Sequence, residues 1–294
     1  MSLSADRIVI EQHPHMVVNR DYVSVLKKCG LLDFDRLYHF QDGTSVKQIQ
    51  DRGVIRMEIR TGDIKKVFYL KRHTAIRISL WEMIGRFCSG KSFSPGRFEF
   101  ENICDFRKRG IPTVVPVAAG EREIGCGRYE SFLLTESFEP YISFEEIIYK
   151  HPEKLQGTEG ARRKAMLIKA IARLARQMHD AGFNHRDFNA THVLVGPEDE
   201  NENFPLALFD FQRMDRKKWL RLKWFIKIMA ELSYTMPEPL FNDQDWLLLF
   251  QSYKGSSRMG IFERLQLKWI RMKMKRIGRH TEKIMKNRKQ MHNT

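Results

Sequence analysis

The stretch NHRDFNATHVLV, residues 184–195, is the part of this sequence that decides between fold classes. It places an aspartate, Asp187, directly after a His-Arg pair, and a further imidazole, His192, follows five residues later. A carboxylate held by a short loop can act as a general base, and an imidazole can bind a metal or orient a neighbour. Because a three-residue match also occurs by chance, the segments on either side decide what the stretch means.

The segments around this stretch follow a regular order of predicted elements. Upstream, ARRKAMLIKAIARLARQMHDAG (161–182) predicts an amphipathic helix that ends at Gly182, because apolar residues recur at steps of four and three. These apolar positions are Leu167, Ile171, Leu174 and Met178. Downstream, THVLVG and FPLALFDF predict two short strands joined by the acidic turn PEDENEN, and the rest of the chain is predicted to be helical. The second half is therefore expected to be mostly helix.

The first half has the alternation that is typical of antiparallel strands. VIRMEIR (54–60) and KKVFYLKR (65–72), separated by the turn TGD, predict a β-hairpin. An earlier strand is expected around residues 37–46. The strand-like runs IPTVVPVAAGE and RYESFLLTE follow later in the chain. These segments predict an antiparallel sheet.

Helices are expected at two places in the first half. SPGRFEFENICDFRKRG (94–110) predicts a helix with a Ser-Pro start that stops at Gly110 and packs on the sheet. Residues 1–37 are expected to form an irregular or helical lead-in, with a short helix that closes at Gly30. Together with the strands, this predicts a β-rich first half with one packed helix.

Composition narrows the class of protein. A chain of 294 residues with 42% hydrophobic residues can fill one large domain or two lobes. No apolar run of about eighteen residues appears, and the N-terminal segment lacks the basic-then-apolar pattern of an export signal, so we expect a cytoplasmic protein. The four cysteines stand far apart with no CxxC pair, which indicates neither a disulfide framework nor a zinc site. They are Cys29, Cys88, Cys104 and Cys126.

The charge of the chain points to anionic partners. Lys and Arg number 51 against 36 for Asp and Glu, a net charge of +15, and such a field concentrates anions. Basic residues gather at 216–227 and from Arg264 onward. No helix-turn-helix, zinc-finger or RNP pattern accompanies them, so a nucleic acid is not the expected partner. The tryptophans are expected to anchor the core and interfaces rather than to stack on bases. They are Trp81, Trp219, Trp224, Trp246 and Trp269.

Charged residues occur in the order that phosphoryl transfer needs. That reaction requires a base for the accepting hydroxyl, a metal held by carboxylate and a cation on the nucleotide phosphates. Lys71 ends the apolar run VFYLK, Asp187 follows a long helix, and Asp210 sits in LFDF at the end of a short apolar strand. Glu99, on the helix after Lys71, is the candidate for the ion pair that holds the lysine, and Glu101 competes with it.

Each of these residues alone also has a purely structural explanation. A lysine at the end of a strand is usually a solvated charge, and an aspartate after an apolar run is often a turn residue. Together, in this order and each on the expected type of element, they favour a phosphotransferase. No GxGxxG motif is present. Gly43 and Gly53 flank the first turn, where a phosphate-binding nest and a bare β-turn both stay open.

The sequence resembles the lipopolysaccharide core kinases, the RfaP/WaaP-type heptose kinases with their Kdo-kinase and InaA-like relatives. The resemblance is carried by GTSVK (43–47), FYLKRH (68–73), EFENICDFRKRGIPT (99–113), VAAGE (117–121), NHRDFNATHVLV and LFDFQR (208–213). In this family a His commonly stands five residues after the loop aspartate, so His192 is an expected residue. One departure from protein kinases is that Asp210 is followed by Phe-Gln rather than Phe-Gly.

The resemblance implies an α+β, two-lobed protein-kinase-like fold, with a small antiparallel β lobe that carries one helix and a larger helical lobe. It implies that Asp187 is the base toward a sugar hydroxyl, with Arg186 beside it in the catalytic loop. It also implies that Asp210 and His192 serve Mg²⁺. The residues assigned to ATP are Lys71, Glu99, Gly43 and Glu136.

The chain is predicted to divide into residues 1–136, a lead-in and nucleotide-binding β lobe, residues 137–260, a helical catalytic lobe, and residues 261–294, a basic helical tail. In the tail, four apolar residues lie on one face of a basic helix, which suits the headgroup layer of an anionic membrane. They are Phe262, Leu265, Trp269 and Met272. A packed lobe helix with a frayed end is the alternative.

The predicted activity is ATP-dependent phosphorylation of a sugar hydroxyl, heptose, in the inner core of lipopolysaccharide. The expected partners are this core, or another anionic glycolipid, and an anionic membrane surface at the inner face of the inner membrane. Two alternatives stay open. One is a kinase of the same fold that acts on Kdo, another small molecule or a protein, and the other is a non-catalytic, kinase-like binding protein at a membrane.

Overall fold

The computed structural model describes residues 8–49, 51–61, 64–88, 90–125, 127–199, 203–216 and 220–292. The chain divides into two compact units. Unit 1 contains Met1–Glu139 and Phe209–Gln212, and unit 2 contains Pro140–Leu208 and Arg213–Thr294. A short segment late in the chain therefore folds with the N-terminal unit. The predicted three-part division stays a prediction.

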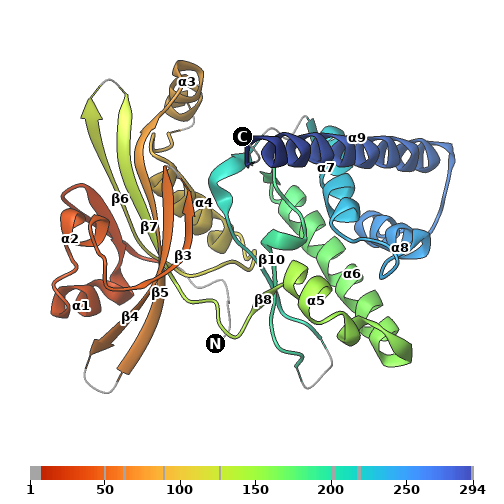
Figure 1. Cartoon of the computed structure of the whole chain (residues 1–294), viewed down its shortest axis with the longest axis horizontal. Helices are drawn as coiled ribbons and strands as arrows, with labels where there is room; N and C mark the ends of the chain where they lie inside the picture. The colour runs from red at the N-terminus through yellow and green to blue at the C-terminus, as the bar shows by residue number, and fades with distance from the viewer. Residues whose placement is uncertain are drawn as a thin grey trace. The chain divides into compact units, whose positions relative to one another are not determined.

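Unit 1 is built on one antiparallel sheet, of which Figure 1 labels β3 to β7. The strand order is β1-β2-β6-β7-β5-β4-β3. Its strands are β1 (Ile10–His13), β2 (Met16–Asn19), β3 (Thr44–Ile49), β4 (Arg52–Thr61), β5 (Ile64–Arg77), β6 (Pro116–Gly125) and β7 (Arg128–Glu136). The predicted hairpin is confirmed, because β4 pairs along its whole length with the first ten residues of β5, up to His73. Its turn, at residues 62–63, lies outside the described residues.

The lead-in differs from the expectation in two ways. The hairpin β1–β2 joins the sheet, with β2 against β6. The segment MVVN of β2 has three apolar residues in a row and is buried on both faces rather than alternating. The strand expected around residues 37–46 begins only at Thr44, because α2 (Phe34–Tyr38) occupies its first part. Asp33 caps this helix by accepting a hydrogen bond from the backbone N–H of Arg36. The expected short helix is α1 (Arg20–Lys28).

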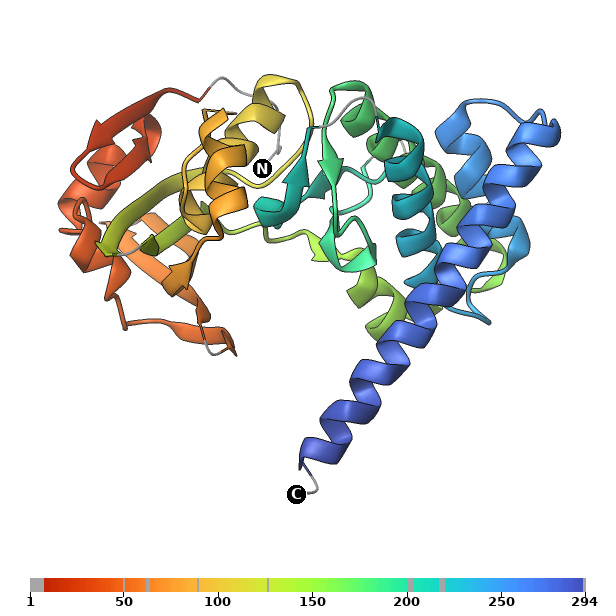
Figure 2. The same ribbon diagram turned by 90° about the horizontal axis from the view of Figure 1, so that it is seen from above.

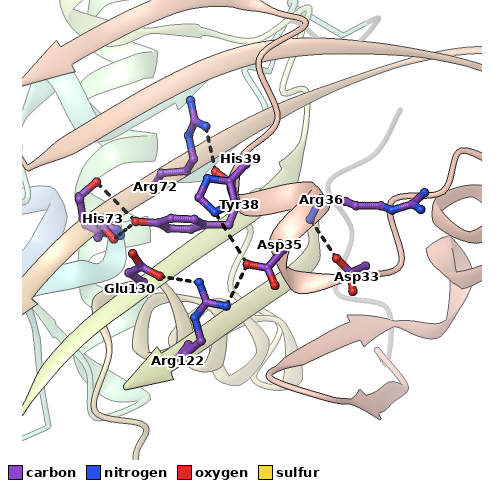
Figure 3. A network of polar contacts seen from close by, with 10 residues as sticks. Asp33, Asp35, Arg36, Tyr38, His39, Arg72, His73, Arg122 and Glu130 are labelled. Atoms are coloured by element: carbon purple, nitrogen blue, oxygen red, sulfur yellow. Dashed lines mark hydrogen bonds and ion pairs between the residues drawn. The ribbon is translucent and has the colours of Figure 1, made fainter. Parts of the chain in front are cut away.

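Polar contacts fix α2 to the sheet (Figure 3). Arg122 of β6 lies 2.9 Å from Asp35 of α2 and 2.8 Å from Glu130 of β7. Arg72 of β5 donates a hydrogen bond to the backbone carbonyl of Tyr38, whose hydroxyl donates to the carbonyl of His73. These contacts join α2 to three central strands and hold β5 in place where it carries the candidate lysine.

The predicted helix 94–110 is confirmed as α4 (Pro95–Lys108), capped by Ser94. Its buried side includes Phe100, Ile103 and Phe106, as expected. It ends two residues before Gly110, whose φ of 70° is the left-handed conformation that favours glycine. A further helix, α3 (Leu80–Cys88), was not expected from the sequence.

Unit 2 is mainly helical. Its helices are α5 (Phe144–Lys150), α6 (Gly157–Asp180), α7 (Arg221–Tyr234), α8 (Asp243–Lys254) and α9 (Ile261–His292). Helix α6 is the predicted amphipathic helix, begins earlier than residue 161, and packs on α8. The two predicted short strands are β10 (Val193–Val195) and β11 (Leu206–Leu208), and β10 also pairs with β8 (Ile142–Ser143). A second ladder joins β9 (Asn184–His185) to β12 (Met214–Asp215).

Helix α9 forms the C-terminal part of unit 2 and packs on α7 (Figure 2). Figure 2 shows it as one long rod that continues beyond the other helices of unit 2. Within the described ranges, no helix is both long enough and apolar enough to cross a membrane. The α+β organisation predicted from the sequence, an antiparallel sheet unit followed by a helical unit, is confirmed.

Candidate active site

A lysine and two carboxylates meet in unit 1. Lys71 Nζ donates hydrogen bonds to Glu99 Oε2 at 3.0 Å and to Asp210 Oδ1 at 2.9 Å. The ion pair between Lys71 and Glu99 that the sequence suggested is therefore present, and Asp210 joins it. Glu101, the competing candidate, accepts hydrogen bonds from Ser92 instead. All of these residues belong to unit 1.

Local structure explains why these groups meet. Lys71 lies on the central strand β5, and alternation directs its side chain away from the face on which its neighbour Leu70 is buried. Glu99 lies on α4 and is 3% exposed. Gly96, one turn earlier, lets this helix approach β7, because a Cβ at this position would lie 2.5 Å from the carbonyl oxygen of Phe132. The close approach brings the carboxylate to the lysine.

The cluster is strongly coupled electrostatically. Burial lowers the pKa of Lys71, but Glu99 and Asp210 raise it by more, so the net shift is upward. Burial raises the pKa of Glu99, and Lys71 opposes this shift. Glu99 also accepts a hydrogen bond from the backbone N–H of Phe211 at 3.1 Å. The amine is thus a fixed positive charge at neutral pH.

Asp210 is held in an unusual backbone conformation. Its φ is 64°, a left-handed value that is uncommon for residues with a Cβ and least so for Asp and Asn. Three contacts of the next residue, Phe211, fix this conformation. Its backbone N–H donates to Glu99, and its backbone carbonyl accepts a hydrogen bond from Asn102 Nδ2 at 3.1 Å. Its ring centroid lies 4.4 Å from that of Phe106. Strained backbone of this kind persists where the surroundings enforce it, often at functional sites.

Gln212 has a structural role at the position where protein kinases have glycine. Its side chain contacts His73 Nε2 on β5 and accepts a hydrogen bond from Arg52 Nη1 on β4 at 3.0 Å. His73 is buried, and this burial, with the charge of Lys71, lowers its pKa to about 3. The departure from Phe-Gly therefore ties the segment that carries Asp210 to the sheet.

Asp187 lies in unit 2 beside an arginine. Arg213 Nη1 donates a hydrogen bond to Asp187 Oδ1 at 2.9 Å, and the aspartate side chain is 30% exposed. The backbone N–H of Asp187 donates to His185 Nδ1 at 3.2 Å. Arg213 directly precedes β12, and Met214 pairs with His185 across the β9–β12 ladder. This ladder brings the guanidinium to the carboxylate.

His192 closes the loop that begins at Asp187. Its Nδ1 lies 2.7 Å from the backbone carbonyl oxygen of Asp187. Because a carbonyl oxygen only accepts, Nδ1 carries the hydrogen and the ring lone pair is on Nε2. The ring also stacks on His185, with centroids 5.7 Å apart. The third histidine of this region, His179, contacts the hydroxyl of Tyr253 at 2.6 Å instead.

Of the two residues predicted to bind magnesium, Asp210 is the more suitable ligand and His192 the less suitable one. Among the residues that the structure describes, no group of three or more His, Cys, Asp or Glu side chains could hold a metal by itself. Magnesium at kinase sites needs few protein ligands, because nucleotide phosphates and water complete its octahedron. The carboxylate of Asp210, which is 35% exposed, fits this hard cation. The imidazole of His192 is a softer ligand and fits it less well.

Arg186 belongs to the framework of the loop. Its guanidinium lies 3.5 Å from Asp215 Oδ2 and over the ring of Trp224 at 5.7 Å. Its backbone carbonyl accepts a hydrogen bond from Lys227, and its backbone N–H donates to the carbonyl of Arg213. The side chain is thus directed to Asp215 and Trp224, and a catalytic role for it stays a prediction.

Two residues assigned to ATP have local contacts of their own. Gly43 precedes β3, and a Cβ there would lie 2.8 Å from the backbone oxygen of Arg56, so glycine permits the close approach of β4. The β3–β4 connection lies at the other end of β3, and its residue 50 is outside the described residues. The carboxylate of Glu136, at the end of β7, lies 3.4 Å from Lys66 Nζ. Contacts of Gly43 and Glu136 with ATP stay predictions.

Sequence reasoning missed Arg213 and Asn102. Arg213 is 26 positions from its partner Asp187, and the ladder that joins them consists of two-residue strands, which no periodicity reveals. Asn102 could have been found from the sequence, because it is a polar residue on the apolar side of a helix and so needs a buried hydrogen-bond partner. That partner is the backbone of the Asp210 segment.

Known proteins are similar to this chain in sequence and in fold. The lipopolysaccharide core heptose(I) kinase WaaP of Pseudomonas aeruginosa is 28% identical over 159 residues, which cover 53% of this chain and 58% of that relative. The match thus spans little more than half the length of that relative. The 3-deoxy-D-manno-octulosonic acid kinase of Actinobacillus succinogenes is 28% identical over 222 residues, which cover 70% of this chain and 83% of that relative.

A solved structure described as WaaP in complex with acyl carrier protein matches with a TM-score of 0.66 and 22% identity, over 90% of this chain and 99% of that chain. This likeness confirms the kinase-like fold. The model of a protein family described as lipopolysaccharide kinase (Kdo/WaaP) matches residues 91–253, more than half of the chain. The matched range contains Glu99, Asp187 and Asp210. On this basis, the chain belongs to the lipopolysaccharide kinase (Kdo/WaaP) family.

Proposed function

We propose that this chain is an ATP-dependent kinase that phosphorylates a sugar hydroxyl in the inner core of lipopolysaccharide, with heptose as the acceptor. The cluster of Lys71, Glu99 and Asp210 carries this proposal, in a chain of the lipopolysaccharide kinase family. It offers a fixed cation for nucleotide phosphates and a carboxylate for a metal. Heptose is chosen because the Pseudomonas aeruginosa relative is named a heptose(I) kinase.

In this proposal, each residue of the cluster has one role toward MgATP. Lys71 neutralises charge on the phosphates, and Glu99 holds the amine in position through its buried ion pair. Asp210 holds Mg²⁺, and the metal-binding role that the sequence predicted for His192 stays a prediction. Bound Mg²⁺ supplies charge neutralisation at the phosphoryl group and orients it.

Asp187 accepts the proton of the attacking hydroxyl. A base must lie within hydrogen-bond reach of its proton, and the exposed part of this carboxylate can meet a sugar. Arg213 binds one carboxylate oxygen and so fixes the rotation of the side chain. His192 holds the backbone of the same residue. We therefore assign Arg213 and His192 as positioning residues for Asp187.

The acceptor is tested by deleting the gene for this chain and analysing the lipid A-core by mass spectrometry. Loss of one phosphate from a core heptose supports the proposal. Loss of a phosphate from Kdo supports the alternative acceptor, which the likeness to the Actinobacillus succinogenes kinase favours. A core with unchanged phosphorylation contradicts both. Complementation with the wild-type chain, but not with Asp187→Asn, ties the effect to the enzyme.

Binding of MgATP separates the kinase from a non-catalytic protein of the same fold. The absence of a GxGxxG motif is the observation that favours the non-catalytic alternative. A ligand that binds only the native state raises the Tm. We expect millimolar MgATP to raise the Tm, and no rise would favour the binding protein.

We also propose a peripheral location at the inner face of the inner membrane. Helix α9 exposes the four apolar residues that the sequence placed on one face, at 41–52% of their surface, along a helix rich in Lys and Arg. They are Phe262, Leu265, Trp269 and Met272.

Because the solved WaaP structure was determined with acyl carrier protein, that protein is a candidate partner of this chain too, and co-purification tests it.

A further inference from the structure

Helix α3 of unit 1 exposes an apolar stripe. Its residues recur at the spacing of one helix face, and their exposed fractions are 69% for Leu80, 82% for Trp81, 46% for Ile84 and 77% for Phe87. Large apolar side chains gathered in this way on a soluble surface mark a site of interaction. Trp81 therefore does not lie in the core, and of the two roles expected for the tryptophans only that of an interface anchor fits it.

The stripe is presented by an ordered helix. Ser79 and Glu82 bond reciprocally at its start, as in a capping box. Ile78 is buried just before the helix, and its backbone N–H donates to the carbonyl of Gly127 in the β6–β7 connection. Figure 1 shows α3 at one end of the sheet of unit 1. The apolar residues thus face solvent because the fold holds them there.

Two arginines lie directly opposite each other beside this helix. Arg77 ends β5 and pairs in register with Arg128, which begins β7. Both are exposed, and no ion pair to either is seen among the described residues. Like charges opposite each other on a sheet destabilise it, so an external anion would relieve this pair. Ile124, at the end of β6, adds a further apolar side chain that is 45% exposed.

We propose that this surface, the tip patch (Leu80, Trp81, Ile84, Phe87, Ile124, Arg77 and Arg128), binds the headgroup layer of an anionic lipid bilayer. Tryptophan is enriched at the boundary between headgroups and acyl chains, phenylalanine on an exposed helix face inserts there, and arginines beside them can bind lipid phosphates. A neutral apolar partner would bring no negative charge to the two arginines, so the repulsion between them would remain. The tip patch lies in unit 1, so it is distinct from α9, and the proposal does not depend on the kinase activity.

Flotation of the full-length protein with vesicles tests the tip patch. Wild-type protein is compared on phosphatidylglycerol-containing and pure phosphatidylcholine vesicles with Trp81→Ser/Phe87→Ser and with Arg77→Gln/Arg128→Gln. The first variant should lower the partition coefficient on anionic vesicles by at least about tenfold, because two large exposed rings no longer insert. The second should lower binding to anionic vesicles and leave binding to neutral ones unchanged. Tyr149→Ser, which removes an aromatic ring that is 64% exposed on α5, is the matched control and should bind like the wild type.

Two results would overturn the proposal. One is unchanged binding of Trp81→Ser/Phe87→Ser to anionic vesicles, which would assign all membrane binding to other surfaces such as α9. The other is a wild-type dimer in light scattering that becomes monomeric in this variant without loss of vesicle binding, which would make the stripe an interface between copies. An unchanged Tm and an unchanged Tm rise with MgATP show that the variants are folded.

Discussion

At the scale of residues, buried and half-buried charge contacts define the candidate chemistry. The types and order of Lys71, Glu99 and Asp210 could be predicted, because each follows or lies on an element with a clear hydrophobic pattern. The contacts of the Lys71 amine with Glu99 at 3.0 Å and with Asp210 at 2.9 Å were an expectation that rested only on the order of these elements. Arg213 could not be predicted, because its contact with Asp187 depends on the register of a two-residue ladder.

Replacing Lys71 by methionine should abolish MgATP binding. The change leaves Glu99 buried without its cation, which costs about 3–5 kcal/mol of the free energy of unfolding when one partner of a buried pair is removed. The measurement is the rise in Tm on addition of MgATP, with urea unfolding for stability. Lys71→Met/Glu99→Gln should regain stability without regaining the Tm rise. Lys47→Met, on the exposed strand β3, is the matched control, and an equal loss in it would contradict the role of Lys71.

Arg213→Gln should lower kcat by about tenfold and leave KM for ATP within about twofold of the wild type, because the residue orients the base rather than the nucleotide. Steady-state kinetics with the core acceptor measure both constants. Arg213→Lys should recover part of kcat by keeping the charge. Arg258→Gln, an exposed loop arginine, controls for lost surface charge. A rise in KM for ATP with unchanged kcat would assign Arg213 to nucleotide binding instead.

At the scale of elements, segments with a clear hydrophobic period were predictable, and segments without one were not. The hairpin β4–β5 and the helices α4 and α6 follow from alternation and from steps of three and four. Strand β2 lacks alternation because both its faces are buried. Helix α2 has only five residues, and its start depends on the Asp33 cap rather than on periodicity. These features explain why β2 and α2 could not be predicted from the sequence.

The contact between α4 and β7 can be tested with a pair of glycine variants. Gly96→Ala should destabilise the protein by roughly 1–3 kcal/mol, because the new Cβ would lie 2.5 Å from the carbonyl oxygen of Phe132. Gly85→Ala in α3 has nothing within 4 Å and should stabilise by about 0.5–1 kcal/mol through helix propensity. Urea unfolding gives both free energies. Equal effects of the two variants would contradict the tight packing of α4.

The contact between α6 and α8 makes stability depend on pH. Burial, with the charge of Arg221, lowers the pKa of His179 from 6.5 to about 4, and Asp180 opposes this shift. The histidine also contacts the hydroxyl of Tyr253, whose pKa burial raises to about 12. As pH falls below 6.5, His179 becomes protonated in the unfolded chain but stays neutral in the folded chain. The stability from neutral His179 is therefore complete above pH 6.5 and is lost progressively toward pH 4.

The measurement is the free energy of unfolding between pH 7 and 4 for the wild type and His179→Gln. The wild-type value should fall with decreasing pH more steeply, by up to about 1.4 kcal/mol per pH unit, because the variant has no imidazole to protonate. Parallel curves for the two proteins would contradict the depressed pKa. A lower stability of the variant at pH 7 alone reports only the lost contact with Tyr253.

At the scale of the whole molecule, the chain combines a β-rich unit that holds the lysine cluster with a helical unit that holds Asp187. This order was predictable, because strand patterns precede helix patterns in the sequence. The return of Phe209–Gln212 to unit 1 was not, because it rests on tertiary contacts of Phe211 and Gln212 with α4 and the sheet. The same segment leads directly into Arg213, so only two residues, Phe211 and Gln212, separate the metal-binding candidate Asp210 from the partner of the base.

Transfer of labelled phosphate from γ-labelled ATP to purified dephosphorylated lipid A-core tests the proposed activity most directly. The wild-type protein should label the heptose, and Asp187→Asn should reduce the rate by about a hundredfold or more while it retains the Tm rise with MgATP. Near-normal transfer by Asp187→Asn, or no transfer to any core sugar by a wild-type protein that binds MgATP, would contradict a lipopolysaccharide kinase that uses Asp187 as its base.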